Sequence, residues 1–324
     1  MLEYGGSQTF RRSRRSQGRG DLETRSSDTP FSPISFPAPP GCSAPAIWTG
    51  SEFLVDGNSL PILSYGTGPA AWSDELTEIH EAVAGGDHYI DRASREHTIG
   101  QLRRWLRVPG ATIMDVGCSS GFLLKQLRRQ FPDCAIVGAD CIREPLERLA
   151  KDAPGIPLLQ FDLAACPLAD RTFDGLTLLN VLEHIEDDLT AARQLLRILK
   201  PGGIAVIEVP AGPALYDVYD RELLHFRRYS MAYLIGRLRT AGFEILNRSH
   251  LGFFLYPAFR IVKKRNRKYL SSAPETRRIV LKESIARSGN SGAMHAIMRL
   301  ESMLRNWVYY PTGIRCLVTC RRPA

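Results

Sequence analysis

Short apolar runs alternate with amphipathic stretches through the middle of the chain. Runs of about four to eight apolar residues bounded by turn residues are typical of buried strands, and apolar residues three or four apart are typical of helices. On this basis we predict strands at 111–117, 134–140, 157–163, 173–180, 204–210, 243–251 and 313–323. Amphipathic helices are predicted at 94–107, 122–131, 142–152, 187–199 and 230–242.

Apolar strands that alternate with helices indicate a parallel sheet covered on both faces. We therefore expect an α/β fold of the Rossmann-like kind: a seven-stranded, mostly parallel sheet with helices on both faces. The sixth and seventh strands form a hairpin-like pair, so the last strand is expected to be antiparallel. Acidic residues after Ser73 predict one further helix before this alternation begins.

Composition divides the chain into five segments. The first is rich in Arg, Ser, Gly and Pro and cannot bury enough apolar surface to fold, so we expect disorder there. A helical cap segment, the main core, a basic and aromatic insertion and a final core strand are expected to follow. The predicted boundaries are 1–45, 46–94, 95–251, 252–312 and 313–324.

The charge of the chain is concentrated near its C-terminus. Residues 252–324 carry 15 Lys and Arg against 3 Asp and Glu, whereas the whole chain has a net charge of +8. This asymmetry favours contact with something anionic or a solvated basic face.

The chain shows no apolar run long enough to span a bilayer and no secretory signal, and its seven Cys lack metal-ligand or disulfide spacing. We therefore predict a cytoplasmic protein.

The residues that follow the predicted strands carry the chemistry. Ligands in an open parallel sheet lie at the carboxyl ends of the strands. Gly117 and Gly121 form a tight turn that opens a helix, whose N-terminal N–H groups face any ligand there. Asp140 ends the second strand, where a carboxylate can accept both hydroxyls of a ribose, and Asp162 ends the third, within reach of an adenine amino group.

These features indicate an adenosine ligand and fit two cofactors. The turn has the spacing Gly117-x-x-x-Gly121 and carries Ser119 where a Gly-x-Gly-x-x-Gly turn for NAD pyrophosphate would need glycine. The spacing therefore favours S-adenosyl-L-methionine (SAM). An NAD-dependent oxidoreductase on a Rossmann fold is the first alternative, and a non-catalytic relative that binds an adenosyl ligand is the second.

The ordered motifs DVGCSSG (115–121), Asp140, Asp162, LLNVLEHIEDD (178–188) and LKPGG (199–203) resemble those of class I SAM-dependent methyltransferases, in particular the small-molecule group that includes ubiquinone-biosynthesis enzymes. Ser119 departs from the glycine that is more common in this family. The resemblance implies SAM as cofactor and a methyl transfer by in-line displacement that needs no metal. It assigns the cofactor site to Asp115, Gly117, Cys118, Gly121, Asp140, Cys141, Asp162, Leu163, Asn180 and Val181.

A second motif, His-x-Arg-Arg-Tyr, follows the fifth strand. The segment 210–230 resembles a subgroup associated with the methylation of glycans, lipids or natural products. His225, Arg227, Arg228 and Tyr229 are therefore predicted on the substrate side. His184 and His225 are the candidate general bases, because an imidazole titrates near neutral pH; a structural role for His184 is the alternative.

The segment 251–268 is apolar and then strongly basic. Its apolar part is too short to span a membrane, so we predict either a lid over the substrate or a peripheral contact with an anionic membrane. The expected partner is a small-molecule, lipid or glycan acceptor, with an anionic group as one option. Nucleic acid is not favoured, because Asn180-Val181-Leu182-Glu183 stands where amino-directed DNA methyltransferases carry an Asn/Asp-Pro-Pro-Tyr motif.

Overall fold

The structure, a computed structural model, describes residues 35–66, 88–287, 292–304 and 308–324. The helix predicted after Ser73 and most of the segment expected to be disordered, 1–45, lie outside these ranges. Residues 35–45 are described, and they include a short strand, β1 (Ser35–Phe36).

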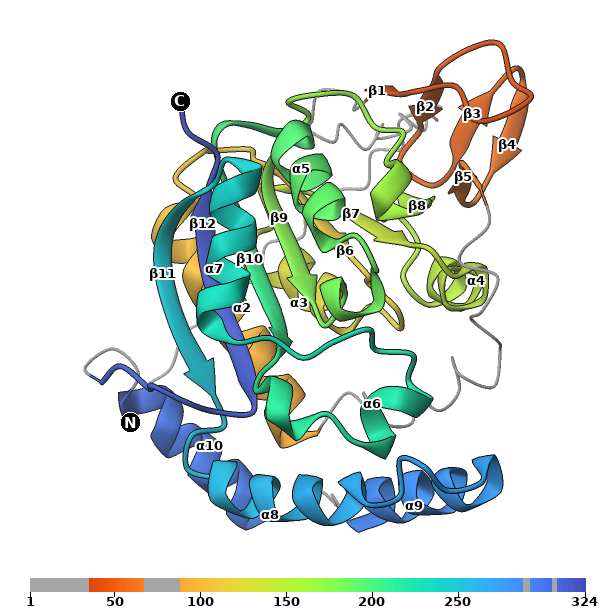
Figure 1. The fold of residues 1–324 in the computed structure, drawn as a ribbon. Coiled ribbons are helices and arrows are strands. Elements are labelled where there is room, and N and C mark those ends of the chain that lie inside the picture. The colour runs from red at the N-terminus through yellow and green to blue at the C-terminus, as the bar shows by residue number, and fades with distance from the viewer. Residues whose placement is uncertain (1–34, 67–87, 288–291, 305–307) are drawn as a thin grey trace, which may run out of the picture. The chain divides into compact units, whose positions relative to one another are not determined.

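A single large sheet forms the centre of the fold (Figure 1). Its strands are β5 (Leu63–Ser64), β6 (Thr112–Val116), β7 (Ala135–Asp140), β8 (Leu158–Gln160), β9 (Phe173–Leu179), β10 (Leu199–Pro210), β11 (Glu244–Leu251) and β12 (Arg315–Arg321). Their order is β11-β12-β10-β9-β6-β7-β8-β5. All seven predicted strands are present, and β12 is antiparallel to both of its neighbours, as predicted. The eighth strand, β5, was not predicted and pairs parallel with β8 at the edge.

Helices cover both faces of this sheet, which confirms the predicted layering. One face carries α2 (Tyr89–Trp105), α3 (Phe122–Gln130) and α4 (Arg143–Asp152), whose leucines and isoleucines pack on β6, β7 and β8. The other carries α5 (Asp188–Ile198) and α7 (Met231–Ala241). Both latter helices begin where the side chain of an N-cap residue, Asp187 or Ser230, accepts a backbone N–H.

The N-terminal part differs from the helical cap expected over 46–94. Residues 46–60 form β2 (Ala46–Trp48), β3 (Phe53–Val55) and β4 (Asn58–Leu60), which join β1 in a small antiparallel sheet. The β3–β4 hairpin turns at Asp56 and Gly57, both at positive φ, as two-residue hairpin turns require. Strands this short have no measurable hydrophobic period, so the sequence pattern does not reveal them. Helical structure in this segment begins only with α2, within the described residues.

The remaining helices gather at the end of the sheet where its parallel strands finish (Figure 1). They are α6 (Val218–Glu222), α8 (Tyr256–Arg267), α9 (Pro274–Arg287) and α10 (Gly292–Leu304). The last three make up most of the predicted basic insertion, 252–312. Among the described residues, none of the helices has the length and apolar character needed to cross a membrane.

Candidate active site

The glycine turn lies between the carboxyl ends of β6 and β7. The N–H groups of Gly117 and Cys118 donate to the carbonyl oxygen of Ala139, at 2.8 and 3.0 Å. Gly117 and Gly121 have φ values of +74° and +72°, which favour glycine. Ser119, the departure from the family pattern, also has a positive φ of +44°. The turn therefore holds a left-handed conformation at three positions just before α3 begins.

The Asp140 carboxylate at the end of β7 is hydrogen-bonded to this turn. Its Oδ2 accepts the Ser119 N–H at 2.9 Å, and its Oδ1 accepts the Ile142 N–H at 3.0 Å. Burial raises the pKa of this carboxyl above its ordinary value, although these hydrogen bonds lower it. Each carboxylate oxygen keeps lone-pair capacity for one more donor. Asp140 is thus oriented by the turn and can still accept a pair of vicinal hydroxyls.

The other predicted cofactor residues lie around the same rim. Asp162 is exposed and accepts the N–H of Ala164, while Leu163 beside it is buried. Asn180 has a φ of +56° and follows β9, and the Val181 side chain fills the space beside Gly117. Asp115 is different: it is buried, and its carboxylate accepts the Thr177 hydroxyl at 2.6 Å.

This donor set fits the SAM molecule. A carboxylate able to accept ribose hydroxyls, an exposed carboxylate on the next strand and apolar walls from Leu163 and Val181 match the sugar, the amino group and the ring of an adenosyl group. Burial, reinforced by the nearby Asp140 charge, raises the pKa of Asp115 to about 7, even though the Thr177 hydrogen bond lowers it. Asp115 therefore links β6 to the neighbouring β9 through Thr177. The individual residue roles remain predictions.

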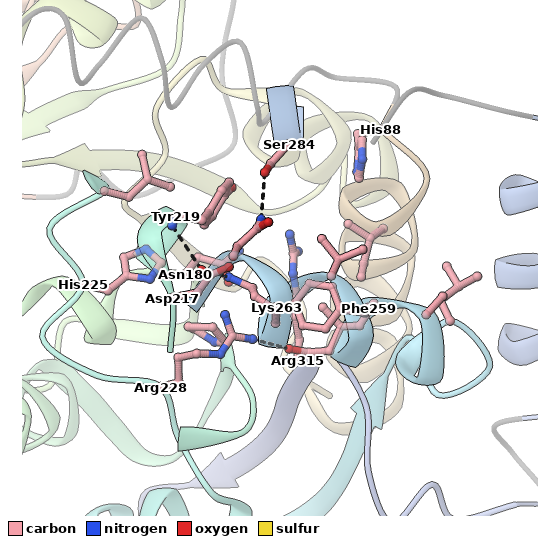
Figure 2. A pocket seen from close by; sticks show the side chains of 18 of the residues that line it. His88, Asn180, Asp217, Tyr219, His225, Arg228, Phe259, Lys263, Ser284 and Arg315 are labelled. Atoms are coloured by element: carbon pink, nitrogen blue, oxygen red, sulfur yellow. Dashed lines mark hydrogen bonds and ion pairs between the residues drawn. The ribbon is translucent and has the colours of Figure 1, made fainter. Parts of the chain in front are cut away.

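A cavity of about 360 Å³ adjoins this rim at Asn180. Figure 2 shows side chains from α2, α6, α8 and β12 converging on it. Part of its wall is apolar, including Tyr89, Tyr219 and Phe259, and part is strongly charged. Of the four predicted substrate-side residues, His225 and Arg228 line this cavity.

The other two, Arg227 and Tyr229, join the loop after β9 to the loop after β10. Arg227 donates to the carbonyl oxygens of Ile185 and Glu186, at 2.7 and 2.6 Å. The buried Tyr229 hydroxyl donates to the Leu182 carbonyl of the same loop at 3.1 Å. These contacts give both residues a positioning role, since neither lines the cavity.

Joining the two loops brings three side chains together: Glu183, His184 and His225. The Phe226 N–H donates to the Glu183 carbonyl at 2.8 Å, and the rings of His184 and His225 meet edge to face with centroids 4.6 Å apart. Burial raises the pKa of Glu183 to about 8. Burial also lowers the pKa of His225, against the opposing effect of the Asp220 carboxylate.

A buried ionic cluster supports the far wall of the cavity. The Lys263 ammonium lies 2.7 Å from Asp217 Oδ1 and 2.9 Å from Asp220 Oδ2. Arg228 Nη1 contacts Asp220 Oδ1 at 2.8 Å, and His225 Nδ1 lies 3.0 Å from the same oxygen. Although burial alone raises it, Lys263 and Arg228 hold the pKa of Asp220 well below its ordinary value.

Arg315 makes a second set of ion pairs beside the first. Its guanidinium contacts the carboxylates of Asp91 and Glu208, the latter at 2.6 Å, and donates to the Ser94 hydroxyl at 2.8 Å. These partners come from α2 and β10, so Arg315 connects the start of β12 to both of these elements. Burial lowers the pKa of Arg315, but the two carboxylates raise it by more. The pKa is therefore above its ordinary value, and the guanidinium stays charged.

Sequence reasoning did not single out several of these residues: Asp91, Asp217, Tyr219, Lys263 and Arg315. Lys263 stands in a run of basic residues in which nothing distinguishes the one that is buried. Asp217 and Asp220 offered a weak signal, because two acids three apart before a basic segment can share one cation. Their convergence depends on tertiary contacts between distant segments.

Comparison with known proteins gives a family match for the centre of the chain. Residues 114–207 match the family model described as "Methyltransferase domain". The chain is 29% identical over 176 residues to a ubiquinone/menaquinone biosynthesis C-methyltransferase from Desulfotalea psychrophila, covering 51% of this chain and 70% of that protein. It is 38% identical over 108 residues to a 2-phytyl-1,4-naphtoquinone methyltransferase from Thermosynechococcus vestitus, covering 32% of this chain and 48% of that protein.

The fold also matches solved structures. Phosphoethanolamine N-methyltransferase 2 from Haemonchus contortus, solved in complex with S-adenosyl-L-methionine, superimposes with a TM-score of 0.53 at 14% identity. The alignment covers 79% of this chain and 58% of that protein. At this identity the match shows the shared fold. The matched relatives are thus covered over about half to 70% of their length.

Proposed function

Because this chain belongs to the class I SAM-dependent methyltransferases, with S-adenosyl-L-methionine as its cofactor, we propose that it methylates a small molecule held in the cavity beside Asn180. The observation that carries the proposal is the position of Asn180, where the cofactor rim meets the cavity. This residue follows β9 on the cofactor rim and also lines the cavity that holds His225 and Glu183. An acceptor in the cavity would thus face the methyl donor.

The cavity favours an acceptor with a ring and a polar atom. Tyr89, Tyr219 and Phe259 offer aromatic surface, and the charged residues beside them can orient a hydroxyl or amine. One relative is named as a ubiquinone/menaquinone biosynthesis C-methyltransferase and another as a 2-phytyl-1,4-naphtoquinone methyltransferase, and a naphthoquinone has a ring with polar oxygens. A quinone-like small molecule is therefore our first candidate, ahead of the lipid and glycan acceptors.

The reaction needs alignment more than activation, because the sulfonium of SAM already activates the methyl group. A bond forms between the acceptor atom and the methyl carbon, the methyl–sulfur bond breaks, and its electron pair stays on sulfur while the acceptor loses a proton. Holding both reactants in line can supply about 7–11 kcal/mol of the barrier. In this chain Asp140 would orient the donor and the cavity walls would orient the acceptor.

His225 and His184 are proposed as proton acceptors. The lowered pKa of His225 keeps its ring neutral at pH 7, as a base requires. General-base catalysis is worth roughly 10²–10⁴-fold. We expect His225→Ala or His184→Ala to slow transfer to a hydroxyl acceptor by at least about tenfold. Smaller losses in both variants would remove this role.

Mass spectrometry identifies the acceptor. The purified protein is incubated with methyl-labelled SAM and separate extracts of polar metabolites, quinones and lipids. We expect label in one low-molecular-weight product, and far less label with the Asp140→Ala variant when SAM is kept at a concentration that only the wild type binds well. Label in no fraction, or equal labelling by the variant, would contradict the proposal.

Helix α8 is proposed as a lid over this cavity. Phe259, Val262 and Lys263 line the cavity from this helix, while Ile261 is 70% exposed on its outer side among basic residues. The outer side suits an anionic membrane surface as a second candidate role. Flotation with anionic and neutral liposomes separates the two: a lid alone binds neither.

A further inference from the structure

The geometry points to a metal site: we propose that Glu183, His184 and His225 bind one divalent transition-metal ion at the inner end of the cavity. One ligand atom from each lies within 4.8 Å of the other two. Metal–ligand bonds of about 2.0–2.2 Å place ligand atoms roughly 3–3.5 Å apart, so small side-chain adjustments complete the site. This inference rests on the proposed function only for its catalytic role.

The buried carboxylate of Glu183 is the second observation that points to a metal ion. The residue is fully buried, and neither oxygen of its carboxylate has a hydrogen-bond partner among the described residues. A buried carboxylate without a partner costs several kcal/mol when ionised, and such groups in native proteins are paired or coordinate metals.

His225 has the support that metal-binding histidines need. Its Nδ1 lies 3.0 Å from Asp220 Oδ1, so a proton on Nδ1 leaves the lone pair on Nε2. Carboxylate–histidine pairs of this kind fix the tautomer and orientation of ligating imidazoles. Asp220 is itself held by Arg228 and Lys263, which makes the support rigid.

The charged side chains around the three proposed ligands are compatible with a bound divalent cation. The three cations Arg228, Lys263 and Arg315 form their ion pairs with four carboxylates: Asp91, Glu208, Asp217 and Asp220. Glu183 is a further acid beside this set, and it has no ion pair of its own in the described part of the chain. Carboxylates thus outnumber cations even before Glu183 is counted.

The types of ligand restrict which ions the site would bind. Two imidazoles and one carboxylate suit Zn²⁺, Mn²⁺, Fe²⁺ or Co²⁺, and they leave coordination positions open. Such an ion is a Lewis acid that lowers the pKa of a hydroxyl it contacts. Since His225 and Glu183 line the cavity, the open positions would face the acceptor. The proposal departs from our expectation that the reaction uses no metal. With the ion bound, His184 and His225 are its ligands, so the base role proposed for them applies to the metal-free protein.

Direct titration tests the site without SAM or acceptor. The chelator-treated full chain is titrated with Co²⁺, followed by visible absorption, and with Zn²⁺, followed by calorimetry. We expect one equivalent of either ion to bind. Glu183→Gln keeps the shape of the side chain and should weaken binding at least about tenfold. Glu186→Gln, the same change at an exposed position of the same loop, should leave binding unchanged.

Folding of each variant is checked by circular dichroism and by its affinity for SAM. If Glu183→Gln fails that check, His184→Asn, at a half-buried position, replaces it with the same expectation. No stoichiometric binding by the wild type, or equal binding by wild type and variant, would overturn the proposal. Metal binding without methylation of any acceptor would instead refute the proposed function and leave the site standing.

Discussion

The cofactor rim and the acceptor cavity meet at Asn180 but are built by different means. The rim consists of short loops after successive strands, and its contacts are mainly backbone hydrogen bonds such as those from Gly117 and Cys118 to Ala139. The cavity wall consists of buried charges brought from distant segments. Arg315, for example, pairs with Asp91 at a separation of 224 residues.

The two regions therefore depend on different sources of stability: backbone conformation in the rim and paired charges in the cavity wall. The rim depends on φ angles that particular residues tolerate, so its weak points are glycines and one oriented carboxylate. The cavity depends on charges that are stable only as a set, because an isolated buried charge is strongly unfavourable. The rim can therefore be disturbed by adding a single methyl group, and the cavity by removing one charge.

Removal of the buried cation should have the largest effect. Lys263→Met leaves Asp217 and Asp220 close together without the ammonium between them. Breaking a buried ion pair from one side costs about 3–5 kcal/mol, which urea unfolding measures. Lys264→Met, at the next and exposed position, should cost less than about 0.5 kcal/mol. Equal stabilities of the two variants would show that the cavity does not depend on this set of charges.

Loss of the rim carboxylate should come next. Asp140→Ala removes the acceptor proposed for two ribose hydroxyls, and hydrogen bonds to a charged group are worth about 1.5–3 kcal/mol each. We expect the affinities for SAM and its demethylated product, measured by calorimetry, to fall roughly 100-fold. Asp133→Ala, just before the other end of β7, is the matched control and should bind like the wild type.

The same contrast explains what the sequence could predict. The rim could be located because Gly117, Asp140 and Asp162 lie at or just after the end of a strand whose apolar pattern is visible, and Gly121 belongs to the same turn as Gly117. The small sheet at residues 35–60 and the edge strand β5 were missed because two or three residues carry no periodic signal.

The cavity could be predicted only in part. His225 and Arg228 were found through a local motif, whereas Lys263 and Arg315 depend on contacts that no local pattern encodes. A buried lysine and an exposed lysine look alike in a basic helix. Arg227 and Tyr229 belong to the same motif as His225 but hold the loops instead, because neighbouring residues on an irregular segment point in different directions.

A methyl group added to the glycine turn tests the rim by shape alone. In Gly117→Ala the new Cβ would clash with Val181 Cγ2, at a φ of +74° that alanine disfavours. We expect a loss of about 2 kcal/mol in unfolding free energy and weaker SAM binding. Gly202→Ala has a similar φ of +78° and no neighbour within 4 Å, so it should lose only about 1 kcal/mol. Equal losses would mean that Val181 moves aside freely.

The pH dependence of stability gives the smallest and most specific test, at the buried acid beneath the rim. Asp115 has a pKa of about 7 in the folded state against an ordinary 3.8, so between pH 5.5 and 6.5 the folded state keeps a proton that the unfolded state has lost. Stability from this group therefore falls as pH rises, by up to about 1.4 kcal/mol per pH unit.

Asp115→Asn cannot ionise, and its side-chain oxygen can still accept the Thr177 hydroxyl. Urea unfolding at pH 5.5 and 6.5 should accordingly show a shallower fall in stability for this variant than for the wild type. Thr177→Val removes the hydrogen bond that lowers the Asp115 pKa, so its fall should extend to higher pH. If the Asn variant and the wild type lost stability in parallel, Asp115 would be ionised in the folded protein. The rim would then hold a buried charge of the kind that distinguishes the cavity, and the contrast between the two regions would not stand.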